Sequence, residues 1–332
     1  MESTLQIDGQ MALSTSRKKI SYAKWGYFLI IPFFVVYAFF SLWPLLQTFF
    51  YSFFEYRKVM TQYVGPNFVG IDNYIQLFSD GEFFEYFGNT LLLWIFCFVP
   101  QIVVSLLLAV WFTDRRLRVR GQRFFKTVIY MPNLIMAAAF GALFLSFFGQ
   151  IGPVNKLLQS MGILKQAFDF PADPWATRII IALMNFLMWF GNTTLLLMSG
   201  VMGIDEDIFE AATVDGAGAF RTFFDITMPL LKPIFVYVFI TSLIGGMQLF
   251  DVADIFTKGS GGSNMTSYTL IMYLNKVVNG SGKNFGLGGA ISVILFIITA
   301  ALSIAVFFVS YKDSLPKKHK KVVKTQWWQT KH

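Results

Sequence analysis

The sequence contains little charge for its length. Only 14% of its 332 residues are charged, whereas an ordinary soluble domain carries about a quarter. Hydrophobic residues make up 55% of the chain, and its mean hydropathy is positive. A single protein core cannot bury that much apolar surface, so the excess must face lipid. This composition excludes an ordinary soluble domain and predicts an integral membrane protein.

Cysteine and histidine are nearly absent, and this excludes several kinds of chemistry. Cys97 is the only cysteine, so no intrachain disulfide can form, and its apolar surroundings predict a small buried side chain. His319 and His332, the only histidines, lie in a basic tail, which argues against a histidine metal site or catalytic triad. No nucleophile–base pair is visible either. We therefore expect no catalytic residue, no metal site and no enzyme activity.

The chain also lacks the Gly-x4-Gly-Lys-Ser/Thr phosphate loop, so it cannot bind ATP in that manner. We expect no cofactor on this chain. The net charge is +8, but the basic residues cluster beside apolar runs. That placement suits lipid headgroups, whereas nucleic-acid readers present a basic face on a soluble module. The expected partner is a lipid bilayer, not nucleic acid.

Long apolar stretches are what the sequence has in abundance. A helix needs about 20 apolar residues to cross the hydrocarbon, and six stretches qualify: 25–53, 89–113, 125–149, 178–203, 233–256 and 286–311. The first lacks the cleavage pattern of a signal peptide and is expected to be retained. The sequence predicts an all-α membrane protein in which a six-helix domain (25–311) lies between an N-terminal tail (1–24) and a basic C-terminal tail (312–332).

The distribution of Lys and Arg predicts the orientation. With the N-terminus inside, the cytoplasmic segments hold four, six, two and seven basic residues, and the three outer segments hold two, three and three. Both termini and the segment 204–232 are therefore predicted to be cytoplasmic. Away from their ends the six stretches contain no Asp, Glu, Lys, Arg or His. Because such groups usually form ion and proton relays, a gradient-driven carrier or channel is disfavoured.

The segment 204–232 has an unusual pattern, which includes "EAATVDGAGAFRTFFDITMP" from Glu210. Asp205 is expected to cap a short helix, with Ile208, Ala211 and Ala212 on one side of it. Gly216 and Gly218 then permit a sharp turn with left-handed backbone conformation. The first helix is expected to present Glu210 and two methyl-sized side chains outward, for contact with another protein.

A second helix is predicted after the turn. Its aromatic residues, Phe220, Phe223 and Phe224, are expected to face the transmembrane helices, and Pro229 and Pro233 direct the chain into the fifth apolar stretch. The alternative interpretation is a simple connector that contains glycine. A bare Glu-Ala-Ala would favour that alternative, but the complete pattern is far rarer.

The pattern resembles the cytoplasmic motif of permease subunits of ATP-binding-cassette importers. The matching residues are Glu210, Ala211, Ala212, Asp215, Gly216, Ala217, Phe224, Ile226 and Pro229. Met228 stands where the family usually has leucine. The resemblance implies a type I importer fold in which the coupling loop 204–232 contacts the ATPase through Glu210, Ala211, Ala212, Asp215, Gly216 and Ala217.

The sequence after the fifth stretch resembles carbohydrate-type permeases of the maltose and glycerol-phosphate kind. The matching residues are Phe250, Asp251, Thr257, Gly259 and Thr266. The family's Gly-Gly-Pro turn is replaced by Gly259-Ser260-Gly261-Gly262, which leaves the shape of that outer turn open. A permease for amino acids, phosphate or metal would share the loop motif but is not expected to share this second pattern.

The resemblance implies partners for the chain in a bacterial plasma membrane. They are a second homologous permease subunit, two ATPase subunits that carry ATP and Mg, and an extracellular solute-binding protein that delivers sugar. An oligosaccharide is the expected cargo. Mono- and disaccharides, a uronate and a glycerol phosphodiester remain admissible, although the lack of basic residues in the spans argues against a strongly anionic one.

Two polar stripes are candidates for sugar contact, since sugars bind aromatic faces and amide or hydroxyl groups. Asn185, Trp189 and Asn192 share one helix face, and Thr241, Gly245 and Gln248 repeat the spacing on the next stretch. The alternative is that these residues pack helices together. The resemblance adds Ser242, Gly246 and Leu249. Maltose-type permeases have asparagine at the last two of these positions, which implies fewer hydrogen bonds here.

Overall fold

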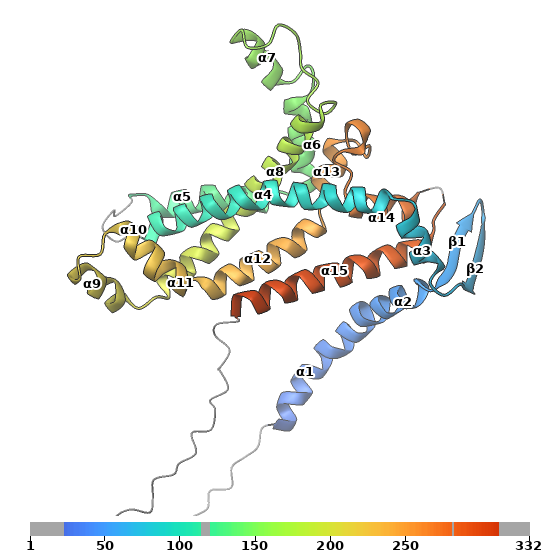
Figure 1. The fold of residues 1–332 in the computed structure, drawn as a ribbon, viewed down its shortest axis with the longest axis horizontal. Helices are drawn as coiled ribbons and strands as arrows, with labels where there is room; N and C mark the ends of the chain where they lie inside the picture. The colour runs from blue at the N-terminus through green and yellow to red at the C-terminus, as the bar shows by residue number, and fades with distance from the viewer. Residues whose placement is uncertain (1–22, 114–119, 281, 312–332) are drawn as a thin grey trace, which may run out of the picture. The chain divides into compact units, whose positions relative to one another are not determined.

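We describe the protein from a computed structural model, which describes residues 23–113, 120–280 and 282–311 (Figure 1). Residues 1–22 of the predicted N-terminal tail, the whole predicted C-terminal tail and residues 114–119 lie outside the described residues. The chain divides into two compact units after Gln47. Among the described residues, five helices are long and apolar enough to cross a membrane, or six if one bent pair forms a single span. The helical membrane architecture is thus confirmed, and the one exception among the described residues is a short β-hairpin.

The N-terminal unit is a single apolar helical run. Helix α1 (Ala23–Tyr37) continues through a π-helical turn (Ala38–Leu42) into α2 (Trp43–Tyr51), which extends into the second unit. Pro44 cannot donate a hydrogen bond to the preceding turn, and the wide turn lies directly before it. The candidate span Lys24–Tyr51 agrees with the first predicted stretch.

A β-hairpin follows α2, and the sequence analysis did not predict it. Strands β1 (Phe54–Val59) and β2 (Gln62–Phe68) pair antiparallel, with a register shift between Glu55 and Arg57. The ring of Tyr56 lies 5.9 Å from that of Tyr63 and 5.1 Å from that of Phe285. Aromatic cross-strand contacts of this kind stabilise a short hairpin that would be marginal by itself.

Four long helices form most of the second unit. They are α4 (Glu82–Thr113), α8 (Pro174–Met202), α12 (Lys232–Met247) and α15 (Phe285–Tyr311), and α12 contacts each of the other three. The shorter α3 (Asp72–Ser79) packs against α15 and α4. Leu77, Ile181 and Met247 are among the fully buried side chains of the shared core.

The third predicted stretch, 125–149, is not one helix, so its predicted extent is wrong. It contains α5 (Gln122–Tyr130), a 3-10 turn (Met131–Leu134) and α6 (Ala137–Phe148), followed by α7 (Pro153–Ser160). Pro132 has no backbone N–H to donate to the preceding turn, and it lies in the 3-10 turn that ends α5. The candidate span shifts to Ala137–Ser160.

The fifth predicted stretch, 233–256, is also broken. Helix α12 ends at Met247, and α13 (Asp251–Phe256) follows after a break. The side chain of Thr269 donates to the carbonyl oxygen of Leu249 at 2.8 Å, so the break gives a backbone acceptor a partner outside the helix. Asp251 is exposed, whereas Asp254 is half-buried.

The loop after α13 adopts a glycine-dependent turn. Gly259, Gly261 and Gly262 have φ values of +78°, +71° and +77°, in the region that favours glycine. This resolves the shape that the missing Gly-Gly-Pro turn left open. A 3-10 turn (Ser263–Met265) leads to α14 (Leu270–Asn279). Arg178 of α8 donates to the carbonyl oxygen of Thr266 at 3.0 Å and ties this loop to the long helices.

Candidate functional site

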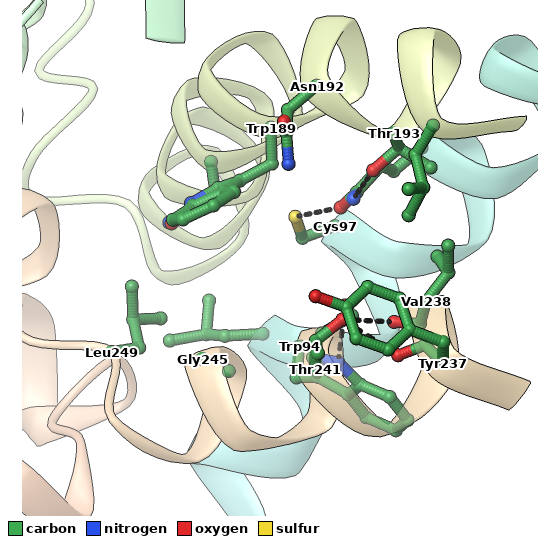
Figure 2. A pocket seen from close by; sticks show the side chains of 16 residues that line it. Trp94, Cys97, Trp189, Asn192, Thr193, Tyr237, Val238, Thr241, Gly245 and Leu249 are labelled. Carbon is green, nitrogen blue, oxygen red and sulfur yellow. Dashed lines mark hydrogen bonds between the residues drawn. The ribbon is translucent and has the colours of Figure 1, made fainter. Parts of the chain in front are cut away.

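A cavity of about 270 Å³ lies between α4, α8 and α12 (Figure 2). No Asp, Glu, Lys, Arg or His is among the described residues that line it. The lining consists of aromatic rings, amides, hydroxyls and small apolar groups, which suits a neutral polar ligand with many hydroxyls. The lining residues are Leu93, Trp94, Cys97, Gln101, Asn185, Trp189, Asn192, Thr193, Leu196, Tyr237, Val238, Thr241, Ser242, Gly245, Gly246 and Leu249.

The cavity brings together eight of the nine residues predicted for sugar contact. These are Asn185, Trp189, Asn192, Thr241, Ser242, Gly245, Gly246 and Leu249. Gln248 is exposed and does not line the cavity. The prediction treated α12 as continuing beyond Gln248, but the helix ends at Met247 and its polar stripe ends with it.

Trp189 is the most prominent side chain on the α8 wall. Figure 2 shows its indole facing Gly245 and Leu249 across the cavity. Trp189 is 48% exposed, so its ring is available to a ligand. On the opposite wall, Thr241 donates to the carbonyl oxygens of Tyr237 and Val238 at 2.8 and 3.2 Å, and its oxygen keeps its capacity to accept.

Helix α4 supplies a third wall that the sequence analysis missed. Gln101 donates through Nε2 to Thr193 Oγ1 at 2.8 Å, and its Oε1 accepts from Cys97 Sγ at 3.6 Å. Cys97 is buried, as predicted. Gln101 is an amide in the middle of an apolar stretch, which is the same signal that identified Asn185. Applied to the second stretch, that signal would have found this wall.

Trp94 of α4 explains a departure from the maltose-type pattern. A Cβ atom at Gly246 would overlap the Trp94 indole, so an asparagine there would require the ring to move. Trp94 Nε1 donates to Ser242 Oγ at 3.2 Å. The ring also stacks on Phe98 at 5.3 Å and meets Phe239 edge to face at 5.5 Å. The indole therefore occupies the volume that a larger residue at Gly246 would need.

The predicted coupling loop begins with helix α9 (Glu206–Val214). Asp205 caps it by accepting from the backbone N–H of Asp207 at 3.2 Å, as predicted. Gly216 has a φ of +73°, which confirms the left-handed turn. Glu210, Ala211, Asp215 and Gly216 are exposed, and Ala217 is half-buried.

One part of the predicted helix surface is wrong. Ala212 is only 7% exposed, so just one of the two methyl-sized side chains faces outward. The backbone N–H of Ala217 donates to the carbonyl oxygen of Ala212 at 2.9 Å, and the chain after the turn folds back beside this residue. Burial of Ala212 follows from that return of the chain.

The orientation of the phenylalanines is also wrong. Phe220 and Phe224 are 82% and 57% exposed and stack on each other, while Phe223 is half-buried. The segment consists of α10 (Ala219–Arg221), a π-helical turn (Thr222–Thr227) and α11 (Met228–Leu230), and it bends by 66° from α12. Thr227 and the following Leu231 are buried, whereas the rings of Phe220 and Phe224 lie on the exposed side of the segment.

The loop and the hairpin lie at opposite ends of the second unit. Figure 1 shows α9, α10 and α11 at the end near α5, and the β1–β2 hairpin beyond the other end of α15. Figure 2 places the cavity between α8 and α12, against α4. A chain with this arrangement can bind a solute between its helices and contact another protein through an exposed loop at one end.

Comparison with known proteins agrees with this arrangement. Residues 101–312 match the family described as the binding-protein-dependent transport system inner membrane component. The chain belongs to this family. The permease is also 28% identical to the lactose transport system permease protein LacF of Rhizobium radiobacter over 90% of its own length and 98% of that protein.

Further relatives indicate the fold and the kind of permease. The multiple sugar-binding transport system permease protein MsmF of Streptococcus mutans is 30% identical, over 89% of this chain and 98% of that one. A chain from the crystal structure of a bacterial ATP-binding-cassette transporter for alginate import matches with a TM-score of 0.71 at 18% identity, covering 89% of this chain and 96% of that chain.

These matches confirm three predictions. The protein is a permease of the carbohydrate-importer type, it has the type I importer fold, and it is a transport subunit and not an enzyme. The apolar helices and the family description confirm a multi-pass protein of the inner membrane.

Proposed function

We propose that this permease forms, together with a second homologous permease subunit, the membrane path for an oligosaccharide. An extracellular solute-binding protein delivers the sugar, and two ATPase subunits carrying ATP and Mg drive its import. The observation that carries this proposal is the uncharged cavity, which is lined by Trp189 together with hydroxyl and amide groups from two other helices. Aromatic faces and directional hydrogen bonds are the means by which proteins recognise neutral sugars.

The names of the relatives support a sugar as cargo. They include permeases for lactose, for arabinooligosaccharides and for trehalose and maltose. A structural neighbour was solved in complex with a periplasmic protein that holds an alginate pentasaccharide. These names and this neighbour support a delivering protein and an oligosaccharide cargo, and the uncharged polar lining of the cavity is consistent with a neutral sugar.

The exposed face of the loop would couple this path to the ATPase subunits. Glu210, Ala211 and Asp215 present two carboxylates and one methyl group over which a partner's groove can close, and Gly216 makes the turn that follows the helix. Ala212 and Ala217, which are less exposed, would then act by holding the turn against the rest of the chain. The permease itself would need no cofactor.

In this proposal the loop and both termini lie in the cytoplasm of a bacterial cell. Because Cys97 is the only cysteine and is buried, single cysteines can be introduced for labelling. Gly218→Cys is expected to react with a membrane-impermeant maleimide only in inverted vesicles. Met60→Cys, at a hairpin position that is 92% exposed, is expected to react in intact cells. The opposite pattern would invert the proposed topology.

The proposed function is tested with radiolabelled sugars. Cells that lack this permease, with and without the restored gene, are given lactose, maltose, trehalose, arabinotriose and raffinose, with an amino acid and glycerol 3-phosphate for comparison. Uptake that depends on the permease is expected for at least one of the sugars. Dependence for the amino acid alone would contradict a carbohydrate cargo.

Trp189→Ala is expected to reduce uptake of the transported sugar by at least about 30-fold, since loss of a central aromatic anchor commonly costs ~2 kcal/mol or more. The matched control is Trp175→Ala, on the same helix outside the cavity, for which we expect little change. Gln248→Ala, also outside the cavity, is expected to have a smaller effect than Trp189→Ala. Parallel loss of the sugar-independent ATPase activity would instead indicate that Trp189 packs the helices.

A further inference from the structure

Two hydroxyl groups in the cavity each accept a hydrogen bond from α4. Ser242 Oγ accepts from Trp94 Nε1 at 3.2 Å, and Thr193 Oγ1 accepts from Gln101 Nε2 at 2.8 Å. All four residues line the cavity. The two bonds thus connect α4 to one hydroxyl on α12 and to another on α8.

The direction of the first bond follows from chemistry, because an indole N–H can only donate. The direction of the second follows from the orientation of the Gln101 amide in the structure, in which Oε1 faces Cys97 Sγ and the NH₂ group donates to Thr193. Each hydroxyl must therefore use an oxygen lone pair toward α4, and its own proton remains available.

Neither hydroxyl proton has another acceptor within the described part of the chain. Hydroxyls on helices often donate to the carbonyl four residues earlier, as Thr194 does to Phe190 at 2.7 Å and Thr241 to Tyr237 at 2.8 Å. Ser242 and Thr193 make no such bond there. Their protons are free to point into the cavity.

We propose that Trp94 and Gln101 are positioning residues that make Ser242 and Thr193 hydrogen-bond donors to the transported sugar. The sugar would present acceptor oxygens, from its ring, its glycosidic links or its hydroxyls, at two places in the cavity. This inference rests on the proposed function. It implies that α4 helps to determine which arrangement of sugar oxygens the cavity accepts. At these two points α4 need not touch the sugar itself.

The test measures the Kd of the radiolabelled sugar that the wild-type cells import best. The sample is the purified importer complex with ATP bound to an ATPase subunit that cannot hydrolyse it, without the binding protein. Trp94→Phe keeps an aromatic ring and removes the N–H donor, and Gln101→Met keeps the length and removes the amide. Each is expected to raise Kd about three- to tenfold, the range for one hydrogen bond. Trp111→Phe, an exposed tryptophan on the same helix, is the control and is expected to leave Kd unchanged.

Double-mutant cycles separate positioning from packing. Trp94→Phe is expected to have no further effect on Kd when Ser242 is already alanine, and Gln101→Met none when Thr193 is already valine. Fully additive effects, or an unchanged Kd in both single variants, would overturn the inference. A fall in melting temperature with additive effects would assign the two residues to helix packing.

The same measurements distinguish this inference from the proposed function. If Trp189→Ala, Ser242→Ala and Thr193→Val all leave Kd unchanged, the cavity does not bind the sugar and the proposed site is wrong. If those three raise Kd while Trp94→Phe and Gln101→Met do not, the cavity binds sugar and only the positioning role fails.

Discussion

Replacing Glu210 with lysine is expected to lower sugar uptake at least about 100-fold, because breaking a buried ion pair costs ~3–5 kcal/mol. Glu210 is exposed on α9 in the isolated chain and becomes buried only if an ATPase groove closes over it, as we propose. The chain's own fold makes no use of this carboxylate as an ion-pair partner among the described residues. The variant should therefore accumulate in the membrane normally, and the loss should appear as sugar-stimulated ATPase activity that is absent in reconstituted complex.

The control for this charge reversal is Asp225→Lys in the same loop. Asp225 pairs with Arg221 at 3.5 Å, and both side chains are well exposed. Loss of such a pair is worth less than about 1 kcal/mol, so uptake should change little. Sugar-stimulated ATPase activity that is unchanged in Glu210→Lys would remove the coupling role from this loop.

Two substitutions at Gly216 test whether the turn after α9 is also needed for uptake. Its φ of +73° is strained for most residues, and a Cβ there would meet no atom within 4 Å, so only the backbone conformation is at issue. Asparagine visits this region readily and valine does not. Uptake with Gly216→Asn should therefore stay near the wild-type level, while Gly216→Val should lose most of it. Equal uptake in the two variants would mean that the turn geometry is not needed.

Replacing Gly191 with alanine is expected to be the most damaging small change to the fold. A Cβ atom at Gly191 would overlap the backbone carbonyl of Ile129 and lie 3.0 Å from Tyr130 Cα. Backbone cannot move aside as a flexible side chain can, so α5 and the following turn would have to separate from α8. Overpacking of this kind costs about 1–3 kcal/mol or more. The expected result is a lower melting temperature in detergent and less protein in the membrane.

The contact of Gly191 with Ile129 and Tyr130 lies close to residues that line the cavity. Asn133 Nδ2 donates to the carbonyl oxygen of Met188 at 2.9 Å beside it, and Trp189 and Asn192 lie on the same turn of α8. Gly88→Ala on α4 is the matched control, since nothing lies within 4 Å of its added Cβ. That change should be neutral or stabilising by up to about 1 kcal/mol. A Gly191→Ala protein that melts like the wild type would show that the contact between α8 and the end of α5 can relax.

The sequence alone determined the class of the protein and the chemistry available to it. Scarce charge and long apolar stretches require a membrane protein whatever the packing, because that much apolar surface has nowhere else to go. The Glu-Ala-Ala and Asp-Gly-Ala residues of the loop pointed to a coupling segment. Gly216 and the Asp205 cap were predictable because turn and cap preferences act over a few neighbouring residues.

Only the tertiary structure decided where the helices break and which faces they bury. The sequence could not show that α12 ends at Met247, since the group that bonds to the Leu249 carbonyl is Thr269, twenty residues later. For the same reason it placed Gln248 beside the cavity and Phe220 against the transmembrane helices. It also missed Trp94 and Gln101, although Gln101 carried a readable signal. Hydropathy reports how much surface must be buried, whereas the partner of each side chain depends on residues that only the folded chain brings together.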